Sequence, residues 1–273
     1  MISIILATYN NEKTISSAIK SILNQSHSNF ELIIVNDFSN DNTKEIIKSF
    51  KDNRIIYIEN ESNIGRSQSR NKGFLKAKGD FIAIMDGDDI SIPERLKIQL
   101  NYLLKNPNVK LVGSNIIYFT DHKVIGLSKL KLYPNNNFNF ILRTIGLPNV
   151  TWMARADFFK KFNYNPKIVS AEDQDLLLKA YDYSQFTLLN DPLVFVRIPK
   201  NINIKYKLKQ LYNLLISRIF YICRKKLLYY IPLVILIYII QSILFILKIN
   251  IRYQNQNSNS NSKYQNLLNK LIK

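Results

Sequence analysis

Apolar residues in the first third of the chain fall into two patterns. Three short segments, "ISIILA", "ELIIVN" and "IIYI", are almost continuously apolar, which predicts strands covered on both faces of a sheet. After the first segment, apolar residues follow the spacing of one helical face: Ile15, Ala18, Ile19 and Ile22. Further helices are predicted around Asn42 to Phe50 and from Ser67 to Ala77. Strands that alternate with helices in this way predict an α/β fold.

A fourth predicted strand ends in a cluster of acids, within "FIAIMDGDDISIPERL" (Phe81 to Leu96). Asp86, Asp88 and Asp89 directly follow the apolar run. Like charges this close repel one another unless a cation lies between them, and a divalent cation with oxygen ligands is the simplest such partner. Ligands of open α/β sheets bind at the carboxyl ends of the strands. We therefore expect a ligand site at this strand end.

Two more polar loops follow predicted strands, "ATYN" (Ala7 to Asn10) and "NDFSND" (Asn36 to Asp41). Each loop alone is typical of a helix cap or a turn. Because the ends of parallel strands meet at one sheet edge, we expect both loops to converge on the same ligand as the acids. Four residues of "NIGRSQSRNKG" are placed to approach a phosphate or a base there: Gly65, Arg66, Arg70 and Asn71.

The region after the acids is less regular. Ser91 and Pro93 predict the start of a helix, with Glu94 in its first turn. The long segment from Val109 to Arg197 is expected to complete the same fold. We therefore predict one folded domain over residues 1–200.

Positive charge is concentrated at the C-terminal end. The chain has 273 residues, with 38 Lys and Arg against 20 Asp and Glu, and no acid occurs after Asp191. The first 196 residues carry a net charge of +4 and the remainder carries +14. A nucleic-acid-binding protein would be expected to carry its basic surface on the folded domain. This distribution excludes nucleic acid as the favoured partner and indicates a membrane surface instead.

An uncharged segment of 21 residues, "LLYYIPLVILIYIIQSILFIL" (Leu227 to Leu247), supports that interpretation. As a helix it would be about 31 Å long, close to the thickness of a bilayer core. A spanning helix is the favoured prediction, and an interfacial or re-entrant helix is the alternative, because Pro232, Gln241 and Ser242 interrupt the run. Residues 201–226 are predicted to form a basic amphipathic juxtamembrane helix. Residues 248–273 are predicted to form a polar basic tail, disordered around "QNQNSNSNS" (Gln254 to Ser262).

The start of the chain and its cysteine content indicate the compartment. "MISIILATYN" lacks the basic region of a signal peptide, and Cys223 is the only cysteine. No intramolecular disulfide can form, which is typical of a reducing compartment. The domain before the tail is therefore expected at the cytoplasmic face of the cell membrane.

These motifs together resemble the inverting glycosyltransferases of family 2, which have the GT-A fold, a Rossmann-like mixed sheet flanked by helices. The resemblance covers about Met1 to Arg197 and depends on the strand-end loops, on "NIGRSQSRNKGFLKAKGDFIAIMDGDD" and on "AEDQDLLLKA". It implies transfer of a sugar from a nucleotide-sugar donor to a hydroxyl of a glycan or lipid-linked acceptor. Enzymes of this kind build bacterial surface polysaccharides.

The resemblance also implies residue roles. Tyr9 and Asp37 should contact the nucleobase, expected to be uracil, while Asp86 and Asp88 should hold the ribose and a Mn²⁺ or Mg²⁺ ion on the diphosphate. The donor-binding set is Ala7, Tyr9, Asp37, Arg70, Asn71 and Asp86, and the metal ligands are Asp88 and Asp86. Neither His27 nor His122 falls in a matching motif, so oxygen ligands are expected.

On the acceptor side, Asp173 in "AEDQD" is implied as the catalytic base. "SAEDQD" is otherwise typical of acids in the first turn of a helix. Glu172 and Trp152 are further acceptor-side candidates, although Trp152 is equally typical of a core residue. A histidine often occurs in the family at the position of Asn149, and its absence leaves the role of Asn149 open.

Two alternatives remain at the level of sequence. One is a polyprenyl-phosphate or processive transferase of the same fold, but "DGDDISIPERL" lacks the residues usual in the former and no Gln-x-x-Arg-Trp motif of the latter is present. The other is a non-catalytic nucleotide-binding scaffold tethered to the membrane. The combination of Asp86, Asp88 and Asp173 favours an enzyme.

Overall fold

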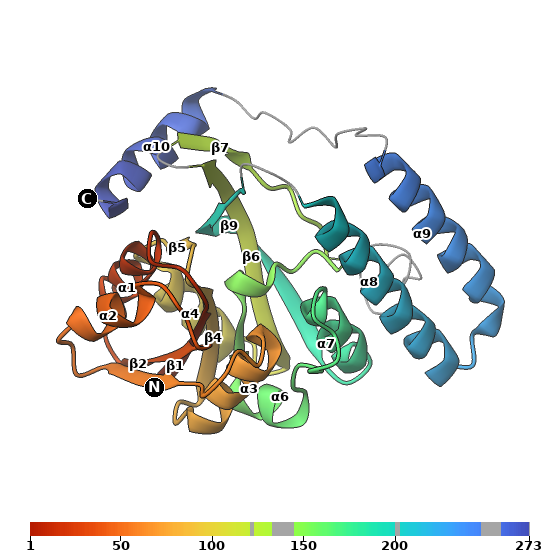
Figure 1. Cartoon of the computed structure of the whole chain (residues 1–273), viewed down its shortest axis with the longest axis horizontal. Helices are drawn as coiled ribbons and strands as arrows, with labels where there is room; N and C mark the ends of the chain where they lie inside the picture. The colour runs from red at the N-terminus through yellow and green to blue at the C-terminus, as the bar shows by residue number, and fades with distance from the viewer. Residues whose placement is uncertain (121–122, 133–144, 200–202, 247–257, 273) are drawn as a thin grey trace.

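The structure is a computed structural model that describes residues 1–120, 123–132, 145–199, 203–246 and 258–272 (Figure 1). Its centre is one curved mixed sheet with the strand order β3-β2-β1-β4-β8-β6-β9-β5, and β7 is added beside β6. Helices cover both faces of this sheet (Figure 1).

The first half of the sheet is parallel. It contains β1 (Ile2–Thr8), β2 (Phe30–Asn36), β3 (Ile55–Glu59) and β4 (Phe81–Asp86). Helices α1 (Ile15–Leu23), α2 (Thr43–Ser49) and α3 (Arg66–Lys76) connect these strands. The predicted strands and helices of this half are confirmed to within one or two residues. Because all four strands run the same way, their carboxyl ends lie at one edge.

The second half of the sheet mixes directions. The short strand β8 (Met153–Arg155) runs antiparallel between β4 and β6 (Val109–Thr120). The long strand β9 (Gln185–Arg197) is parallel to β6, while β5 (Ile90–Ser91) and β7 (Lys123–Leu127) are short and antiparallel. The segment from Val109 to Arg197 therefore completes the same sheet, as predicted.

The helices of this half include α4 (Arg95–Lys105), α6 (Ala156–Lys161) and α7 (Glu172–Ala180), with a 3₁₀ turn, η1 (Asn149–Thr151), before β8. The predicted helix start after the acids was placed too early. Ser91 belongs to β5, and Glu94 is the residue before α4, outside its first turn.

Trp152 belongs to the hydrophobic core. Its side chain has 0% exposure, its Nε1 donates a hydrogen bond to the carbonyl oxygen of Leu147 at 3.0 Å, and its ring is stacked with that of Tyr164. A side chain enclosed in this way has no face free for a sugar. The acceptor-side role predicted for Trp152 is therefore wrong, and the alternative of a core tryptophan holds.

The C-terminal region is helical. Helix α8 (Ile204–Arg224) packs against α7, and a 3₁₀ turn η2 (Leu228–Tyr230) leads into α9 (Ile231–Ile246), the outermost helix in Figure 1. Helix α10 (Ser258–Ile272) packs against β7 and α1. The predicted disorder is wrong for residues 258–262, because they begin this helix, and residues 254–257 lie outside the described residues.

Candidate active site

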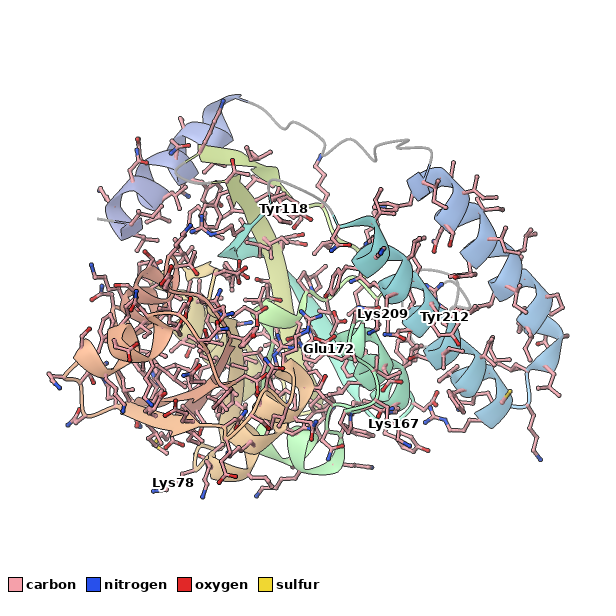
Figure 2. All side chains as sticks on the ribbon, in the orientation of Figure 1. Lys78, Tyr118, Lys167, Glu172, Lys209 and Tyr212 are labelled. Atoms are coloured by element: carbon pink, nitrogen blue, oxygen red, sulfur yellow. The ribbon has the colours of Figure 1, made fainter. Side chains whose placement is uncertain are left out.

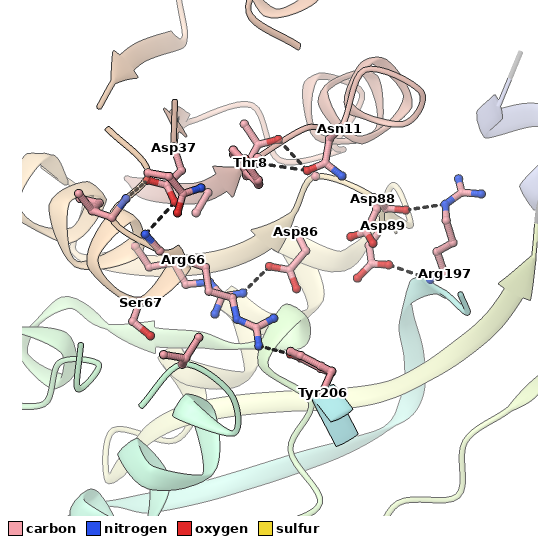
Figure 3. Close-up of a pocket in the computed structure, with 18 of the residues that line it drawn as sticks. Thr8, Asn11, Asp37, Arg66, Ser67, Asp86, Asp88, Asp89, Arg197 and Tyr206 are labelled. Atoms are coloured by element: carbon pink, nitrogen blue, oxygen red, sulfur yellow. Dashed lines mark hydrogen bonds and ion pairs between the residues drawn. The ribbon is translucent and has the colours of Figure 1, made fainter. Parts of the chain in front are cut away.

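A cavity of about 590 Å³ lies at the carboxyl ends of β1, β2 and β4 (Figure 3). Strand β1 contributes Ala7 and Thr8, the loop after it contributes Tyr9 and Asn11, and β4 leads into Asp86, Gly87, Asp88 and Asp89. Helix α3 contributes Arg66, Ser67 and Arg70, and more distant segments contribute residues that include Arg197 and Tyr206. The strand-end loops therefore converge on one site, as predicted.

Asp37 lies at one end of this cavity and is 3% exposed. Its Oδ1 accepts hydrogen bonds from the side-chain amide of Asn60 at 2.8 Å and the backbone N–H of Ile64 at 2.9 Å. Its Oδ2 accepts one from the N–H of Gly65 at 2.9 Å. The carboxylate therefore positions the loop before α3. Gly65 can adopt the required φ of 85° because it has no Cβ.

The turn after β1 is tied to the acidic turn after β4. The hydroxyl of Thr8 donates a hydrogen bond to Asn11 at 2.9 Å, and the hydroxyl of Thr14 donates to the carbonyl of Gly87 at 2.9 Å. A Cβ at Gly87 would lie 2.9 Å from the Thr8 hydroxyl oxygen, which is too close. Gly87 therefore lets the two loops pack together, and Tyr9, 46% exposed, projects from the first of them.

The three acids after β4 have different partners. Asp86 forms an ion pair with Arg70, with 2.6 Å between Oδ1 and the guanidinium. Asp89 is buried and accepts a hydrogen bond from the backbone N–H of Arg197 at 2.8 Å. Burial, and next the charge of Asp88, raises the pKa of the Asp89 carboxyl well above its usual range.

Among the residues that the structure describes, no lysine or arginine pairs with the carboxylate of Asp88, and Arg197 bonds only to the backbone carbonyl of Asp88, at 3.1 Å. Burial, and next the charge of Asp86, raises the pKa of Asp88 to about 6. A bound cation would stabilise the ionised form of a carboxyl group whose pKa is raised in this way.

These oxygen donors fit Mn²⁺ or Mg²⁺, which prefer carboxylate ligands. Within the described part of the chain, no group of three Asp, Glu, His or Cys side chains is arranged to hold a metal ion. Asp88 and Asp86 would therefore supply part of the coordination only. The remaining ligands would have to come from a bound diphosphate or from water.

A network of ion pairs connects the acidic turn to the start of α7. Arg70 is 3% exposed and contacts both Asp86 and Glu172, the latter at 3.0 Å. Glu172 also pairs with Arg66 at 2.7 Å, and Arg66 donates a hydrogen bond to the hydroxyl of Tyr206 on α8. Glu172 is 4% exposed, and its Oε1 positions both arginines. Its place on the acceptor side stays a prediction.

Asp173 follows Glu172 in the first turn of α7. Asp173 does not line the cavity, but Arg66, which pairs with the neighbouring Glu172, does. Burial, and next the charge of Glu172, raises the pKa of Asp173 to about 6. The residue before this turn, Ala171, has φ 61°, a left-handed conformation that L-residues rarely adopt. Backbone strain of this kind is common at functional sites.

One predicted donor-binding residue lies elsewhere. The side-chain amide of Asn71 donates to the carbonyl of Tyr164 at 2.8 Å and accepts from its N–H at 3.0 Å. Asn71 is not among the residues that line the cavity, so it connects α3 to the segment before α7. The donor-binding role predicted for Asn71 is wrong. Asn149 donates to the hydroxyl of the same Tyr164.

Two polar residues that reach the cavity from distant segments were not identified from the sequence. Arg197 ends β9, and Tyr206 lies in the first turn of α8. The only sequence feature that marks Arg197 is its position as a single arginine after the apolar segment "LVFV". Tyr206 was assigned to a juxtamembrane helix, and only the packing of α8 against α7 brings it to the cavity (Figure 3).

The sequence matches the family model "Glycosyl transferase family 2" over residues 3–163, more than half of the chain. The chain belongs to glycosyl transferase family 2. An uncharacterised glycosyltransferase of Methanocaldococcus jannaschii is 36% identical over 221 residues, which cover 77% of this chain and 75% of that protein. The UDP-Glc:alpha-D-GlcNAc-diphosphoundecaprenol beta-1,3-glucosyltransferase WfgD of Escherichia coli is 32% identical over 190 residues, covering 70% and 73% of the two chains.

Solved structures show the same fold. The mannosyltransferase PcManGT of Pyrobaculum calidifontis, solved with GDP-Man and Mn²⁺, superposes with a TM-score of 0.64 at 14% identity, covering 99% of this glycosyltransferase and 84% of that chain. TarS 1-349 of S. aureus in complex with UDP superposes with a TM-score of 0.63 at 22% identity, covering 79% of this chain and 64% of that one. The GT-A fold predicted for this family 2 glycosyltransferase is confirmed.

Proposed function

We propose that this glycosyltransferase transfers a sugar, with inversion, from a UDP-linked donor to a hydroxyl of a lipid-linked or surface glycan acceptor. The observation that carries this proposal is the cavity that joins Asp37 at one end to Asp86 and Asp88 further along, with Tyr9 also in its lining (Figure 3). A nucleoside diphosphate sugar has the same order of groups, a base followed by a charged diphosphate. The UDP-Glc donor of WfgD and the UDP bound to TarS support a uridine donor.

Tyr9 offers an exposed ring to the nucleobase. Asp37 holds the neighbouring loop through the N–H groups of Ile64 and Gly65. It therefore shapes the part of the cavity proposed for the nucleobase, with or without a direct contact to that nucleobase. At the other end, Arg197 and Arg66 supply positive charge beside the acids. A Mn²⁺ or Mg²⁺ ion held by Asp88 and Asp86 would neutralise the charge that develops on the leaving diphosphate.

In the transfer step, the acceptor hydroxyl attacks the anomeric carbon from the side opposite the diphosphate. The bond between that carbon and the diphosphate oxygen breaks, and the nucleoside diphosphate leaves with the bonding electrons. The hydroxyl proton passes to the carboxylate of Asp173, which acts as general base. One displacement inverts the anomeric configuration. Glu172, Arg66 and Arg70 position this half of the site relative to Asp86.

We place this reaction at the cytoplasmic face of the cell membrane. The acceptor of WfgD is a diphosphoundecaprenol-linked sugar, and the present chain has an apolar helix after its catalytic domain. A lipid-linked acceptor and a membrane-associated enzyme would meet at the same surface. The donor sugar and the linkage follow from pocket contacts that the fold does not specify.

The test combines donor binding with turnover. Full-length protein is screened by thermal denaturation with UDP-glucose, UDP-N-acetylglucosamine, UDP-galactose and GDP-mannose in Mn²⁺, because a bound donor raises the unfolding temperature by mass action. Release of UDP is then measured with a polyprenyl-diphosphate-linked sugar. We expect stabilisation by a UDP-sugar and turnover that a chelator abolishes.

Asp88→Asn is the site variant and Asp157→Asn the matched control, since Asp157 is an exposed acid paired with Lys110 away from the cavity. Asp88→Asn should lower turnover by about 100-fold or more with little change in unfolding temperature. The control should retain turnover. Donor binding without any sugar transfer, or wild-type turnover in Asp88→Asn, would contradict the proposal.

A further inference from the structure

The outer face of α9 is apolar and uncovered. One stripe of the helix, including Ile231, Val234 and Tyr238, packs toward α8. The remaining surface exposes large apolar side chains: Leu233, Leu236, Ile239, Ile240, Ile243, Leu244 and Ile246. Leu228–Ile246 has a mean hydropathy of 2.2 and is long enough by composition to cross a membrane. A soluble surface helix would carry polar residues on its outer face.

The geometry points to an in-plane membrane contact: α9 inserts its outer face into the surface of an anionic bilayer, parallel to that surface, and does not cross it. The partner is a lipid surface with negatively charged headgroups. This inference concerns attachment and does not depend on which donor or acceptor the enzyme uses. It departs from the spanning helix that the sequence favours.

The first reason is that α8 is fixed to the catalytic domain by polar contacts along its length. Asn213 donates to the carbonyl and the hydroxyl of Ser170, each at 3.1 Å, and Ser217 donates to Asp175 at 2.9 Å. Further along, Tyr221 donates to Asp182 at 3.0 Å. Carboxylates and their partners in a bilayer core would be costly. Helix α8 therefore stays outside the bilayer core with α7.

The second reason is that α9 runs back beside α8. Figure 1 shows the two helices side by side and antiparallel, joined by the short turn at η2. A helix that crossed the bilayer along its own axis would carry α8, and with it α7, into the hydrocarbon. An orientation parallel to the membrane surface buries the outer face of α9 alone. The catalytic domain and α8 then remain in the aqueous phase above α9.

The third reason is where the chain continues. Helix α10 packs on the catalytic domain, with Leu268 0% exposed, the ring of Tyr264 in edge contact with Phe195, and the N–H of Val124 donating to Gln265 at 2.8 Å. Both neighbours of α9 therefore belong to the same folded body. A single crossing would place them on opposite sides of the membrane. Residues 247–257 are fewer than the roughly 20 apolar residues that a returning helix needs.

The positive charge of the C-terminal region indicates which lipid headgroups it would bind. Fourteen basic residues and no acidic residue occur from Arg197 onward. Three of them, Arg224, Lys225 and Lys226, lie just before η2 and α9 and are exposed, and Arg224 and Lys225 also pair with Asp182 at 3.3 and 3.0 Å. Basic residues at the edge of an apolar helix bind anionic headgroups, each contributing on the order of 1 kcal/mol near the surface. Anionic vesicles should therefore bind the protein more tightly than neutral ones.

The topology is tested with cysteines. The native Cys223 is exposed and lies before α9. A second variant, Cys223→Ser with Asn266→Cys, places the only thiol on an exposed position of α10. Full-length protein is expressed in bacterial cells and labelled with a membrane-impermeant maleimide, in spheroplasts and in inverted membrane vesicles. We expect both thiols to react in inverted vesicles only. Reaction of one thiol in spheroplasts and of the other in inverted vesicles would overturn the proposal.

The contact face is tested with vesicles of phosphatidylglycerol and phosphatidylcholine. Leu236→Glu and Ile240→Glu change exposed residues of α9, and Leu75→Glu is the control because Leu75 is 86% exposed on α3. We expect the α9 variants to lose at least about tenfold in vesicle affinity and the control to bind as the parent does. Unchanged binding of both α9 variants would overturn the proposal. Donor-induced thermal stabilisation without vesicles should be normal in all three, so failure of attachment is distinguishable from failure of the proposed activity.

Discussion

At the scale of single residues, the carboxylates of the site differ in what already neutralises them. Asp37 is satisfied by backbone N–H groups, and Asp86 and Glu172 share Arg70. Asp88 and Asp173 both have a pKa raised to about 6, mainly by burial. Burial also raises the pKa of Asp89, but the carboxylate of Asp89 accepts a hydrogen bond from the N–H of Arg197. Asp88 and Asp173 are the two acids proposed for the metal and for the acceptor proton. Separation of roles by environment is common among catalytic acids.

Asp173→Asn should lower the rate of sugar transfer by about 100-fold or more, because the amide keeps the shape but cannot accept a proton. In the parent enzyme the base is lost as pH falls through about 6, so the rate should rise with pH across that value. The variant should lack this rise. Transfer is measured from pH 5 to 8 with UDP release as the readout.

Donor affinity is the control for Asp173→Asn, and calorimetry should show it nearly unchanged. Loss of donor binding would assign Asp173 to the donor site. A parental transfer rate would place the base elsewhere.

Arg70→Met should destabilise the fold, since it leaves a buried Glu172 and a half-buried Asp86 without their shared cation. Removing one partner of a buried ion pair typically costs about 3 kcal/mol or more. Lys110→Met is the matched control, because the pair of Lys110 with Asp157 is exposed and should contribute less than about 1 kcal/mol. Urea unfolding of both variants gives the comparison. Equal losses would argue against the importance of the buried network.

At the scale of elements, α8 has two roles. Its first turn brings Tyr206 to the cavity, and its later turns hold α7 and support α9. The helix thus connects the cavity to the apolar face of α9, which is the proposed membrane contact. Its C-terminal end is closed by a Schellman motif, in which the N–H of Leu227 bonds to the carbonyl of Ile222 at 3.0 Å and that of Lys226 bonds to Cys223 at 3.1 Å.

Lys226→Gly should stabilise the fold, because Lys226 ends this motif with φ 56°, where a side chain is strained. Relief of that strain is worth about 1 to 2 kcal/mol, and the greater freedom of glycine in the unfolded chain removes part of it. A net gain of up to about 1 kcal/mol is expected by thermal unfolding. Lys225→Gly is the control, since Lys225 has a right-handed helical conformation, and it should be neutral or destabilising.

At the scale of the whole molecule, the C-terminal residues form part of the folded domain. Leu268, Tyr264 and Leu271 of α10 join the cluster formed by β5, β6, β7 and β9, which includes Phe119 and Phe195. This packing places both flanks of α9 on one body and is the basis of the in-plane membrane contact proposed above.

Leu268→Ala should therefore cost about 2 to 5 kcal/mol of unfolding free energy, as deletion of a fully buried leucine side chain does. Leu75→Ala, at an 86% exposed position, should change it by less than about 0.5 kcal/mol. Urea unfolding measures both. A negligible effect of Leu268→Ala would mean that α10 does not dock in solution.

The sequence by itself determined the parallel half of the sheet and the polar side chains at its edge. Continuous apolar runs and period-3.6 apolar patterns are local, and the carboxyl ends of parallel strands meet at one edge whatever the rest of the chain does. The positions of Tyr9, Asp37, Asp86 and Asp88 around one cavity follow from those two facts.

Only the tertiary structure decided which polar side chains face the cavity and which tie segments together. Trp152 and Asn71 have the chemistry of ligand-binding residues, but burial and partners distant in sequence give them structural roles. The position of Tyr206 and the docking of α10 also depend on long-range packing. An apolar run of the same composition can cross a bilayer or lie on it. The folded contacts of its flanking helices favour the second arrangement, because they hold both ends of α9 on one side.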